Sequence, residues 1–278
     1  MKRNFLNIAC ILMAAAFISS CGEKKQVSQE FPDWAWADFQ RPAGVNPVIS
    51  PDTTTFFYCP MRQDSVAWEA SDTFNPAATI YDGKVVVLYR AEDNSAVGIG
   101  SRTSRLGYAY SEDGLNFKRM SAPVFYPGDD SQKELECPGG CEDPRVAMTE
   151  DGLYVMLYTA WNRQTPRLAV ATSRDLKNWT KHGLAFEKAY DGRFAKIASK
   201  SASILTKVND GKIVIDKVDG KYFMYWGEYA VYAATSENLV DWYPVLDENN
   251  QLKKLARPRK GYFDSQMTEC GPPAIRTK

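Results

Sequence analysis

Short apolar and aromatic runs recur along the chain at nearly constant intervals, and each follows an Asp-Gly pair. The Asp-Gly pairs that precede these three runs begin at residues 82, 151 and 219, so they lie 69 and 68 residues apart. Runs of this kind, bounded by turn residues, are typical of β-strands. The pattern predicts three equivalent strands: Lys84–Tyr89, Leu153–Tyr158 and Lys221–Trp226.

A second marker recurs with almost the same period. It is a Ser followed two residues later by Asp or Asn and then by an aromatic residue, with copies spaced by 62 and 63 residues. The copies are Tyr110–Asp113 with Phe117, Thr172–Asp175 with Trp179, and Thr235–Asn238 with Trp242. Fixed self-similarity on this scale indicates a repeat array. Strands separated by Asp-Gly turns favour an all-β protein, a β-propeller rather than a helical solenoid.

The composition fits one domain, which we expect over residues 31–278. With 44% apolar residues, a chain of 278 residues can bury a large core. The formal net charge is zero and no basic cluster stands out, so nucleic acid is not expected as a partner. The 7 Trp and 15 Tyr residues suit a carbohydrate site, where aromatic faces stack on sugar rings, although most should fill space between repeats.

The N-terminus reads as a targeting segment. Basic residues precede the apolar run Ile8–Ile18, which is too short to span a bilayer, and Ile18–Cys21 resembles a bacterial lipobox. We expect residues 1–20 to be a lipoprotein signal peptide and residues 21–30 to be a tether, with Cys21 lipidated. The protein would then be exported and lipid-anchored in the cell envelope, facing the periplasm or exposed on the outer membrane. The alternative is an ordinary cleaved signal with an incidental cysteine.

Export changes how the remaining cysteines are interpreted, because disulfides persist outside the reducing cytoplasm. Cys137 and Cys141 are candidates for a disulfide that would close a small loop before Asp143. The only histidine, His182, lies in a segment that reads as a surface turn, which disfavours a zinc site and a hydrolase with a histidine base. No metal or cofactor is expected. The cysteines after residue 21 are Cys59, Cys137, Cys141 and Cys270.

Carboxylate side chains remain as the candidate catalytic groups. In a propeller the innermost strand of each repeat starts near the axis, so equivalent strand starts converge there. Asp143 opens one such strand and lies between Glu142 and Arg145, where nearby charges can tune its pKa. The alternative is a strand-capping Asp that pairs with Arg145. The expected innermost strands are Phe74–Ile80, Asp143–Met148, Ser201–Leu205 and Gly271–Ile275.

Two glutamates are candidate partners for Asp143. Glu228 ends an apolar strand, and Glu269 directly precedes the Gly-Pro-Pro run at residues 271–273. Cleavage of a glycosidic bond needs one carboxylic acid to protonate the leaving oxygen and one carboxylate to activate water or attack the sugar. Asp143 with Glu228 or Glu269 would supply this pair. Either glutamate could instead be a structural hydrogen-bonding residue.

Several of these runs together resemble glycoside hydrolase family 130, from about residue 65 to the end of the chain. The resemblance implies a five-bladed β-propeller that acts on β-mannosides, either as a mannoside phosphorylase or as a β-1,2-mannosidase. The matching runs are Asp72–Ala78, Val87–Glu92, Ser104–Gly107, Glu142–Arg145 and Gly271–Pro273.

The resemblance implies roles for matched positions. Asp143 corresponds to the catalytic acid, and Asn75, Arg90 and Lys200 correspond to residues of the mannose subsite. Arg145 would hold the acid or a substrate oxygen.

The resemblance also bears on the nucleophile. Phosphorylases of the family use a histidine among their phosphate-binding residues, and His182 lies outside the matching runs. Glu228 and Glu269 lie where hydrolytic members carry acidic residues proposed to activate water. Carboxylates repel a phosphate dianion and can accept a proton from water. We therefore expect an exo-acting, inverting β-mannosidase whose partner is a mannoside oligosaccharide.

Other interpretations stay open. They are a mannoside phosphorylase, another propeller glycosidase such as an arabinanase or xylosidase, and a non-catalytic glycan-binding lipoprotein. A five-bladed propeller needs more chain than is present, because Ile275–Lys278 ends just inside the fourth repeat. The sequence is therefore expected to be a fragment or a truncated family member, with open strand edges. No feature marks an oligomer interface.

Overall fold

The computed structural model describes residues 39–277. The predicted signal peptide, the tether and Cys21 lie outside these residues. All the strands below belong to one compact unit, Arg41–Lys278. Within the described residues the only α-helix is α1 (Lys133–Glu136), and no helix there is long and apolar enough to cross a membrane.

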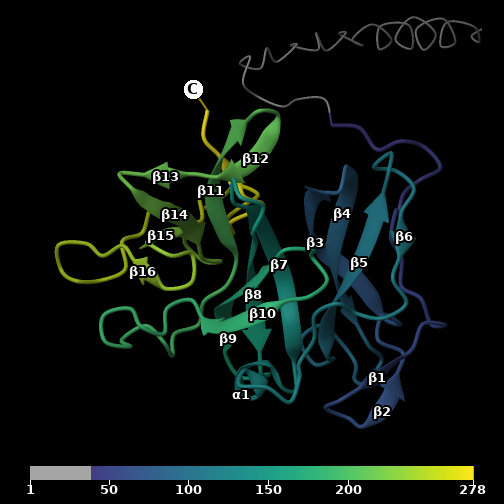
Figure 1. The fold of residues 1–278 in the computed structure, drawn as a ribbon. Coiled ribbons are helices and arrows are strands. Elements are labelled where there is room, and N and C mark those ends of the chain that lie inside the picture. Colours follow the sequence, from purple (N-terminus) through teal and green to yellow (C-terminus); the bar gives the residue numbers. More distant parts are fainter. Residues whose placement is uncertain (1–38, 278) are drawn as a thin grey trace, which may run out of the picture. The chain divides into compact units, whose positions relative to one another are not determined.

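The strands form three successive antiparallel meanders, which we call the first, second and third meander (Figure 1). The first contains β3 (Asp72–Tyr81), β4 (Lys84–Glu92), β5 (Ser104–Ser111) and β6 (Lys118–Arg119). The second contains β7 (Gly140–Met148), β8 (Tyr154–Trp161), β9 (Pro166–Ser173) and β10 (Thr180–Leu184). The third contains β11 (Ala202–Asn209), β14 (Lys221–Trp226), β15 (Tyr232–Ser236) and β16 (Trp242–Pro244).

Shorter strands extend this plan. The additional strands are β1 (Phe57–Cys59), β2 (Asp64–Val66), β12 (Lys212–Ile215), β13 (Lys217–Val218) and β17 (Ala274–Ile275). The first and second meanders join through one parallel pair, Ser104 with Gly140, and β17 pairs in parallel with β11. No described sheet closes on itself. The predicted all-β fold is confirmed, and β4, β8 and β14 are the three strands that the Asp-Gly pattern predicts.

Three of the four predicted innermost strands begin a meander, whereas the fourth, Gly271–Ile275, is reduced to the two-residue β17 beside β11. β3, β7 and β11 each begin their meander, and both β3 and β11 pack beside β7 (Figure 1). Their starts therefore come together although they are far apart in sequence. This convergence places the candidate residues at the heads of β3, β7 and β11 in one region.

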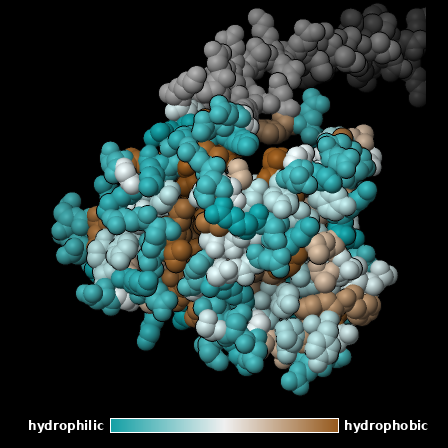
Figure 2. Space-filling model, viewed as in Figure 1, coloured by the Kyte–Doolittle hydropathy of each residue, from teal (hydrophilic) through white to brown (hydrophobic). Residues whose placement is uncertain are grey.

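Strands of the second meander are apolar on both faces because each face enters a different core. In β8, Val155 and Leu157 join the core shared with the third meander, whereas Met156 and Tyr158 join the core shared with the first. Successive side chains of a strand point to opposite faces, so this alternation fills both cores. Burying each such side chain contributes about 1.5–3 kcal/mol. The face shown in Figure 2 is mostly hydrophilic, with apolar residues in narrow strips.

The second sequence marker is a repeated hydrogen-bonded turn. The Ser173 hydroxyl accepts the backbone N–H groups of Asp175 at 3.1 Å and Leu176 at 2.8 Å. Ser111 and Ser236 accept the equivalent bonds in the other two meanders. A Ser side chain can bond nearby backbone donors in this way and so fixes the turn. This requirement explains why the Ser recurs with the repeat.

The predicted disulfide between Cys137 and Cys141 is wrong, because both thiols are free. Cys141 is fully buried on β7 and packs in the core between the first and second meanders. Cys137 follows α1 and caps it through its backbone N–H. The strand begins at Gly140, between the two cysteines, and it directs Cys141 into the core.

Candidate active site

A β-bulge sets the direction of the side chains at the heads of β3 and β7. The strand register shifts at Asn75-Pro76 in β3 and at Asp143-Pro144 in β7. Asn75 and Asp143 have left-handed backbones, with φ of 44° and 48°, and Ser201 just before β11 has φ of 57°. Asn and Asp adopt this conformation more readily than most residues, and outliers of this kind cluster at functional sites. The three innermost strands thus begin alike, each with a polar residue.

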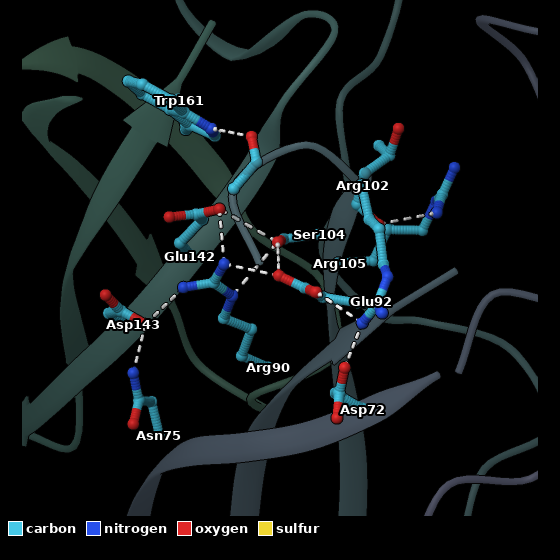
Figure 3. A network of polar contacts seen from close by, with 12 residues as sticks. Asp72, Asn75, Arg90, Glu92, Arg102, Ser104, Arg105, Glu142, Asp143 and Trp161 are labelled. Atoms are coloured by element: carbon cyan, nitrogen blue, oxygen red, sulfur yellow. Dashed lines mark hydrogen bonds and ion pairs between the residues drawn. The ribbon is translucent and has the colours of Figure 1, made fainter. Parts of the chain in front are cut away.

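Three side chains bind Asp143, and Figure 3 shows the contacts with two of them, Asn75 and Arg90. Asn75 Nδ2 donates to Asp143 Oδ1 at 2.8 Å, and Arg90 Nη1 donates to the same oxygen at 3.1 Å. Lys200 Nζ lies 3.2 Å from Oδ2. Burial opposes the negative charge, but the charges of Arg90 and Lys200 and the bond from Asn75 outweigh it and lower the pKa of Asp143. The free protein therefore holds Asp143 as a carboxylate.

Arg90 is the centre of a buried ionic cluster (Figure 3). Its Nη2 lies 2.6 Å from Glu92 Oε1 and 2.8 Å from Glu142 Oε1, while Nη1 binds Asp143. Its Nε donates to Ser104 Oγ at 3.0 Å. One guanidinium thus contacts three carboxyl groups, and its side chain is only 4% exposed. This arrangement uses the planar fork of donors that only arginine offers.

Glu142 differs from its neighbour in protonation. Burial raises the pKa of Glu142 to about 7, and the negative charge of Asp143 adds to the rise, against the opposing effect of Arg90. Two adjacent carboxyl groups therefore have pKa values displaced in opposite directions. Such a displacement is how proteins assign acid and base roles to paired carboxyl groups.

Glu228 reaches the same space through a glycine-dependent turn. Gly227 has φ of 120°, and a Cβ there would lie 2.1 Å from the carbonyl oxygen of Ala230. The Gly227 N–H donates to the Lys200 carbonyl at 3.1 Å, which fixes the turn against the head of β11. Lys200 Nζ lies 3.5 Å from Glu228 Oε1. Lys200 therefore stands between the carboxylates of Asp143 and Glu228.

Glu269 lies next to the same segment. The Ser201 hydroxyl donates to Glu269 Oε1, and the Thr268 N–H donates to the Glu228 carbonyl at 3.0 Å. Glu269 also acts through its charge on the pKa of Lys200, which its acidic neighbours Asp143 and Glu228 raise against the effect of burial. The structure thus brings both candidate glutamates to the lysine that contacts Asp143.

Two residues singled out by sequence lie differently from expectation. Arg145 Nη1 donates to the Pro144 carbonyl at 3.2 Å, and within residues 39–277 Arg145 has no ion pair with Asp143, whose arginine partner is Arg90. The prediction that His182 lies in a surface turn is wrong, because this exposed residue is part of β10. There its Nε2 is 2.8 Å from Thr172 Oγ1.

Several members of the cluster have no role that the sequence predicts. The sequence marks Ser201 only as the start of a strand. Glu92 and Ser104 are marked only by lying inside the runs that match the family. Glu92, Ser104 and Glu142 contact one another only because β4, β5 and β7 lie side by side in the folded protein. Their spacing along the chain does not reveal this contact.

The site combines ionised and neutral carboxyl groups with convergent arginine, lysine and amide donors. Cleavage of glycosidic bonds requires carboxyl groups in both states, and polar donors of this kind bind sugar hydroxyls. The fold and the site thus define a carbohydrate-active enzyme.

Comparisons with known proteins give the family. The family model described as β-1,4-mannooligosaccharide phosphorylase, glycoside hydrolase family 130, matches residues 46–278. The chain belongs to this family.

Three relatives illustrate the range of similarity. A solved structure from Bacteroides thetaiotaomicron VPI-5482 is 76% identical, with a TM-score of 0.88, covering 89% of this chain and 71% of that chain. Another is 68% identical, with a TM-score of 0.88, covering 89% of this chain and 69% of that chain. It comes from work on family 130 glycoside hydrolases that target β-1,2 mannosidic linkages in Candida mannan.

The third relative is a 1,2-β-oligomannan phosphorylase from Thermoanaerobacter sp. (strain X514). It is 32% identical over 216 residues, which is 76% of this chain. The chain spans 62% of the length of this curated relative.

Proposed function

We propose that the protein is an exo-acting glycoside hydrolase that releases mannose from β-mannosides by an inverting mechanism, with β-1,2 as its linkage. The observation that carries the proposal is the pair of glutamates, Glu228 and Glu269, gathered around Lys200 opposite Asp143. The close similarity to a protein described with β-1,2-targeting hydrolases supports the linkage. The whole protein would be a five-bladed propeller.

In this proposal each residue has one task. Asp143 gives a proton to the leaving oxygen, and Glu228 or Glu269 accepts a proton from the attacking water. Asn75 and Arg90 orient Asp143 and contact the mannose hydroxyls. Lys200 bridges the carboxylates of Asp143 and Glu228 in the free protein, and a bound sugar draws it away from Asp143 onto the sugar hydroxyls.

The alternative function is a β-mannoside phosphorylase, which the description of the curated relative favours. The two are separated by incubating the full chain with β-1,2- and β-1,4-mannobiose, with and without inorganic phosphate. Hydrolysis yields mannose without phosphate. Formation of mannose 1-phosphate only when phosphate is present would overturn the hydrolase proposal, and binding without turnover would support a non-catalytic glycan-binding protein.

Replacing the true base should lower the rate far more than replacing the other glutamate. We expect Glu228→Gln or Glu269→Gln to reduce kcat by about 10²–10⁴-fold, because general base catalysis contributes about that much. The measurement is the initial rate of mannose release from β-1,2-mannobiose. Glu237→Gln is the matched control, since Glu237 is 80% exposed and, within residues 39–277, forms an ion pair only with Lys221. Unchanged rates in both Glu228→Gln and Glu269→Gln would contradict the role of these residues.

We further propose that Cys21 carries a lipid and anchors the exported protein in the cell envelope. The lipobox-like run Ile18–Cys21 supports this. Cys21→Ser should then move the protein from the membrane fraction to the soluble fraction of cells. Equal membrane association of both forms would argue against the anchor.

A further inference from the structure

Two carboxyl groups approach one hydroxyl group inside the Arg90 cluster. Ser104 Oγ lies 3.3 Å from Glu92 Oε1 and 3.0 Å from Glu142 Oε1 (Figure 3). The same oxygen accepts the Nε–H of Arg90 at 3.0 Å. A serine hydroxyl has a single proton to donate. Ser104 can therefore donate a hydrogen bond to only one of the two carboxyl groups. The other carboxyl group can hydrogen-bond to Ser104 only if it is itself protonated and acts as the donor.

Glu142 is the carboxyl group that brings the proton. Glu92 contacts two guanidinium groups, Arg90 at 2.6 Å and Arg102 at 3.3 Å, so two positive charges face it. Glu142 shares only Arg90, at 2.8 Å, and lies beside the negative Asp143. A neutral Glu142 donates to Ser104, and Ser104 then donates to Glu92. In this state the Ser104 hydroxyl donates one hydrogen bond and accepts two, which its one proton and two lone pairs allow.

Arg90 contacts Glu142 and Asp143 through different nitrogens. Nη2 faces Glu142 and Nη1 faces Asp143 at 3.1 Å. Moving one proton from Glu142 to Asp143 moves one negative charge from the Nη1 side of the guanidinium to the Nη2 side. The O–H bond on Glu142 breaks and an O–H bond on Asp143 forms, so the net charge around Arg90 does not change. The transfer therefore creates no additional buried charge that would need an ion-pair partner.

We propose that Glu142 stores the catalytic proton, holding it in the free protein and passing it to Asp143 when a sugar binds. Glu142 is then a positioning residue for the proton, and the inference rests on the proposed role of Asp143 as the acid. A sugar that draws Lys200 away from Asp143 removes one of the positive charges that keep this carboxylate ionised. The two carboxyl groups share one proton and titrate as a pair.

The groups that face Glu142 come from each neighbouring element. They are Arg90 and Glu92 from β4, Ser104 from β5, Asp143 from β7 and Lys200 from the segment before β11. Burial raises the pKa of Glu142 to about 7, so the pair keeps its proton up to neutral pH although the pKa of Asp143 is lowered. Activity should consequently persist to neutral pH and decline above it.

The variant Glu142→Gln separates a proton store from a structural side chain. The amide keeps a donor for Ser104 and an acceptor for Arg90 but cannot release a proton. We expect wild-type kcat/KM to fall about tenfold per pH unit above about pH 7. In Glu142→Gln the fall should begin at least one pH unit lower, with about tenfold or greater loss at pH 7 that recovers toward pH 5. Glu142→Asp, which keeps a titratable group, should restore part of the neutral activity.

A control and an independent readout complete the test. Glu136→Gln changes a buried glutamate that contacts Lys181 rather than Arg90. This variant should show the same fall of kcat/KM at high pH as the wild type. Thermal unfolding against pH reports the stored proton without any substrate. A raised carboxyl pKa contributes stability that is fully present below about pH 4.5 and is lost as the pH rises to about 7. Between these pH values the wild-type Tm should therefore fall more than that of Glu142→Gln.

The outcomes separate this inference from the proposed function. The proposal that Glu142 stores the proton would be overturned by either of two results. One is a dependence of Tm on pH in Glu142→Gln that parallels the wild type, and the other is a fall of kcat/KM that begins at the same pH in both proteins. If the wild type hydrolyses no mannoside while the Tm profiles differ as expected, the proton on Glu142 stands and the proposed function fails.

Discussion

Asp143→Asn is expected to lower kcat for β-1,2-mannobiose by about 10²–10⁴-fold, the loss typical of removing a general acid. An Asn at this position can still accept hydrogen bonds from Asn75 and Arg90, so the fold should be kept. It cannot hold the proton that the leaving oxygen needs. Initial rates of mannose release, with the Tm measured in parallel, separate the loss of chemistry from the loss of structure.

The matched control is Asp151→Asn. Asp151 lies at the turn before β8 and pairs with Arg174 at the surface, where its side chain is 68% exposed. Its replacement should change neither the rate nor the Tm appreciably, because exposed ion pairs contribute little. An Asp143→Asn protein that keeps more than about a tenth of the wild-type rate would remove Asp143 from the role of acid.

Arg90→Leu should destabilise the protein by about 3–5 kcal/mol, because it leaves buried carboxylates without their cation. Glu142 and Asp143, whose pKa values Arg90 lowers, would then take up protons more readily, so the native variant binds more protons than the wild type. The loss of stability should therefore be smaller at pH 5 than at pH 8. Urea denaturation at the two pH values measures the difference in the free energy of unfolding.

Arg174→Leu is the control for this substitution, since Arg174 pairs with the exposed Asp151 at 2.8 Å. It should cost at most about 1 kcal/mol. The loss in the free energy of unfolding for Arg90→Lys should lie between the losses for Arg90→Leu and Arg174→Leu, because lysine keeps the charge but not the fork of donors. An Arg90→Leu protein within about 1 kcal/mol of the wild type would show that the cluster does not depend on the arginine.

The repeats made most of the fold predictable. Turn residues and apolar runs recur because each meander needs the same turns and fills the same kind of core, so the starts of β3, β7 and β11 could be placed from sequence. Asp143 could be predicted as a site residue because it lies at one of these strand starts. Arg90 and Lys200 required the family resemblance, because nothing local in the sequence marks a buried cation.

The Glu142–Asp143 pair could not be predicted from the strand pattern. Neighbouring residues in a regular strand point to opposite faces, so alternation would place only one of them at Arg90. The bulge at Asp143-Pro144 and the left-handed backbone of Asp143 allow both side chains to reach the same guanidinium. The mistaken Cys137–Cys141 disulfide has a related cause, because sequence spacing does not show where β7 begins.

The central claim is that water, directed by the glutamates opposite Asp143, attacks the mannoside with inversion. The most direct measurement follows the first turnovers on β-1,2-mannobiose in ¹⁸O-labelled water by NMR and mass spectrometry. The expected first product is α-mannose carrying the label at its anomeric carbon, formed without phosphate. Release of β-mannose, or of mannose 1-phosphate only in the presence of phosphate, would contradict the account.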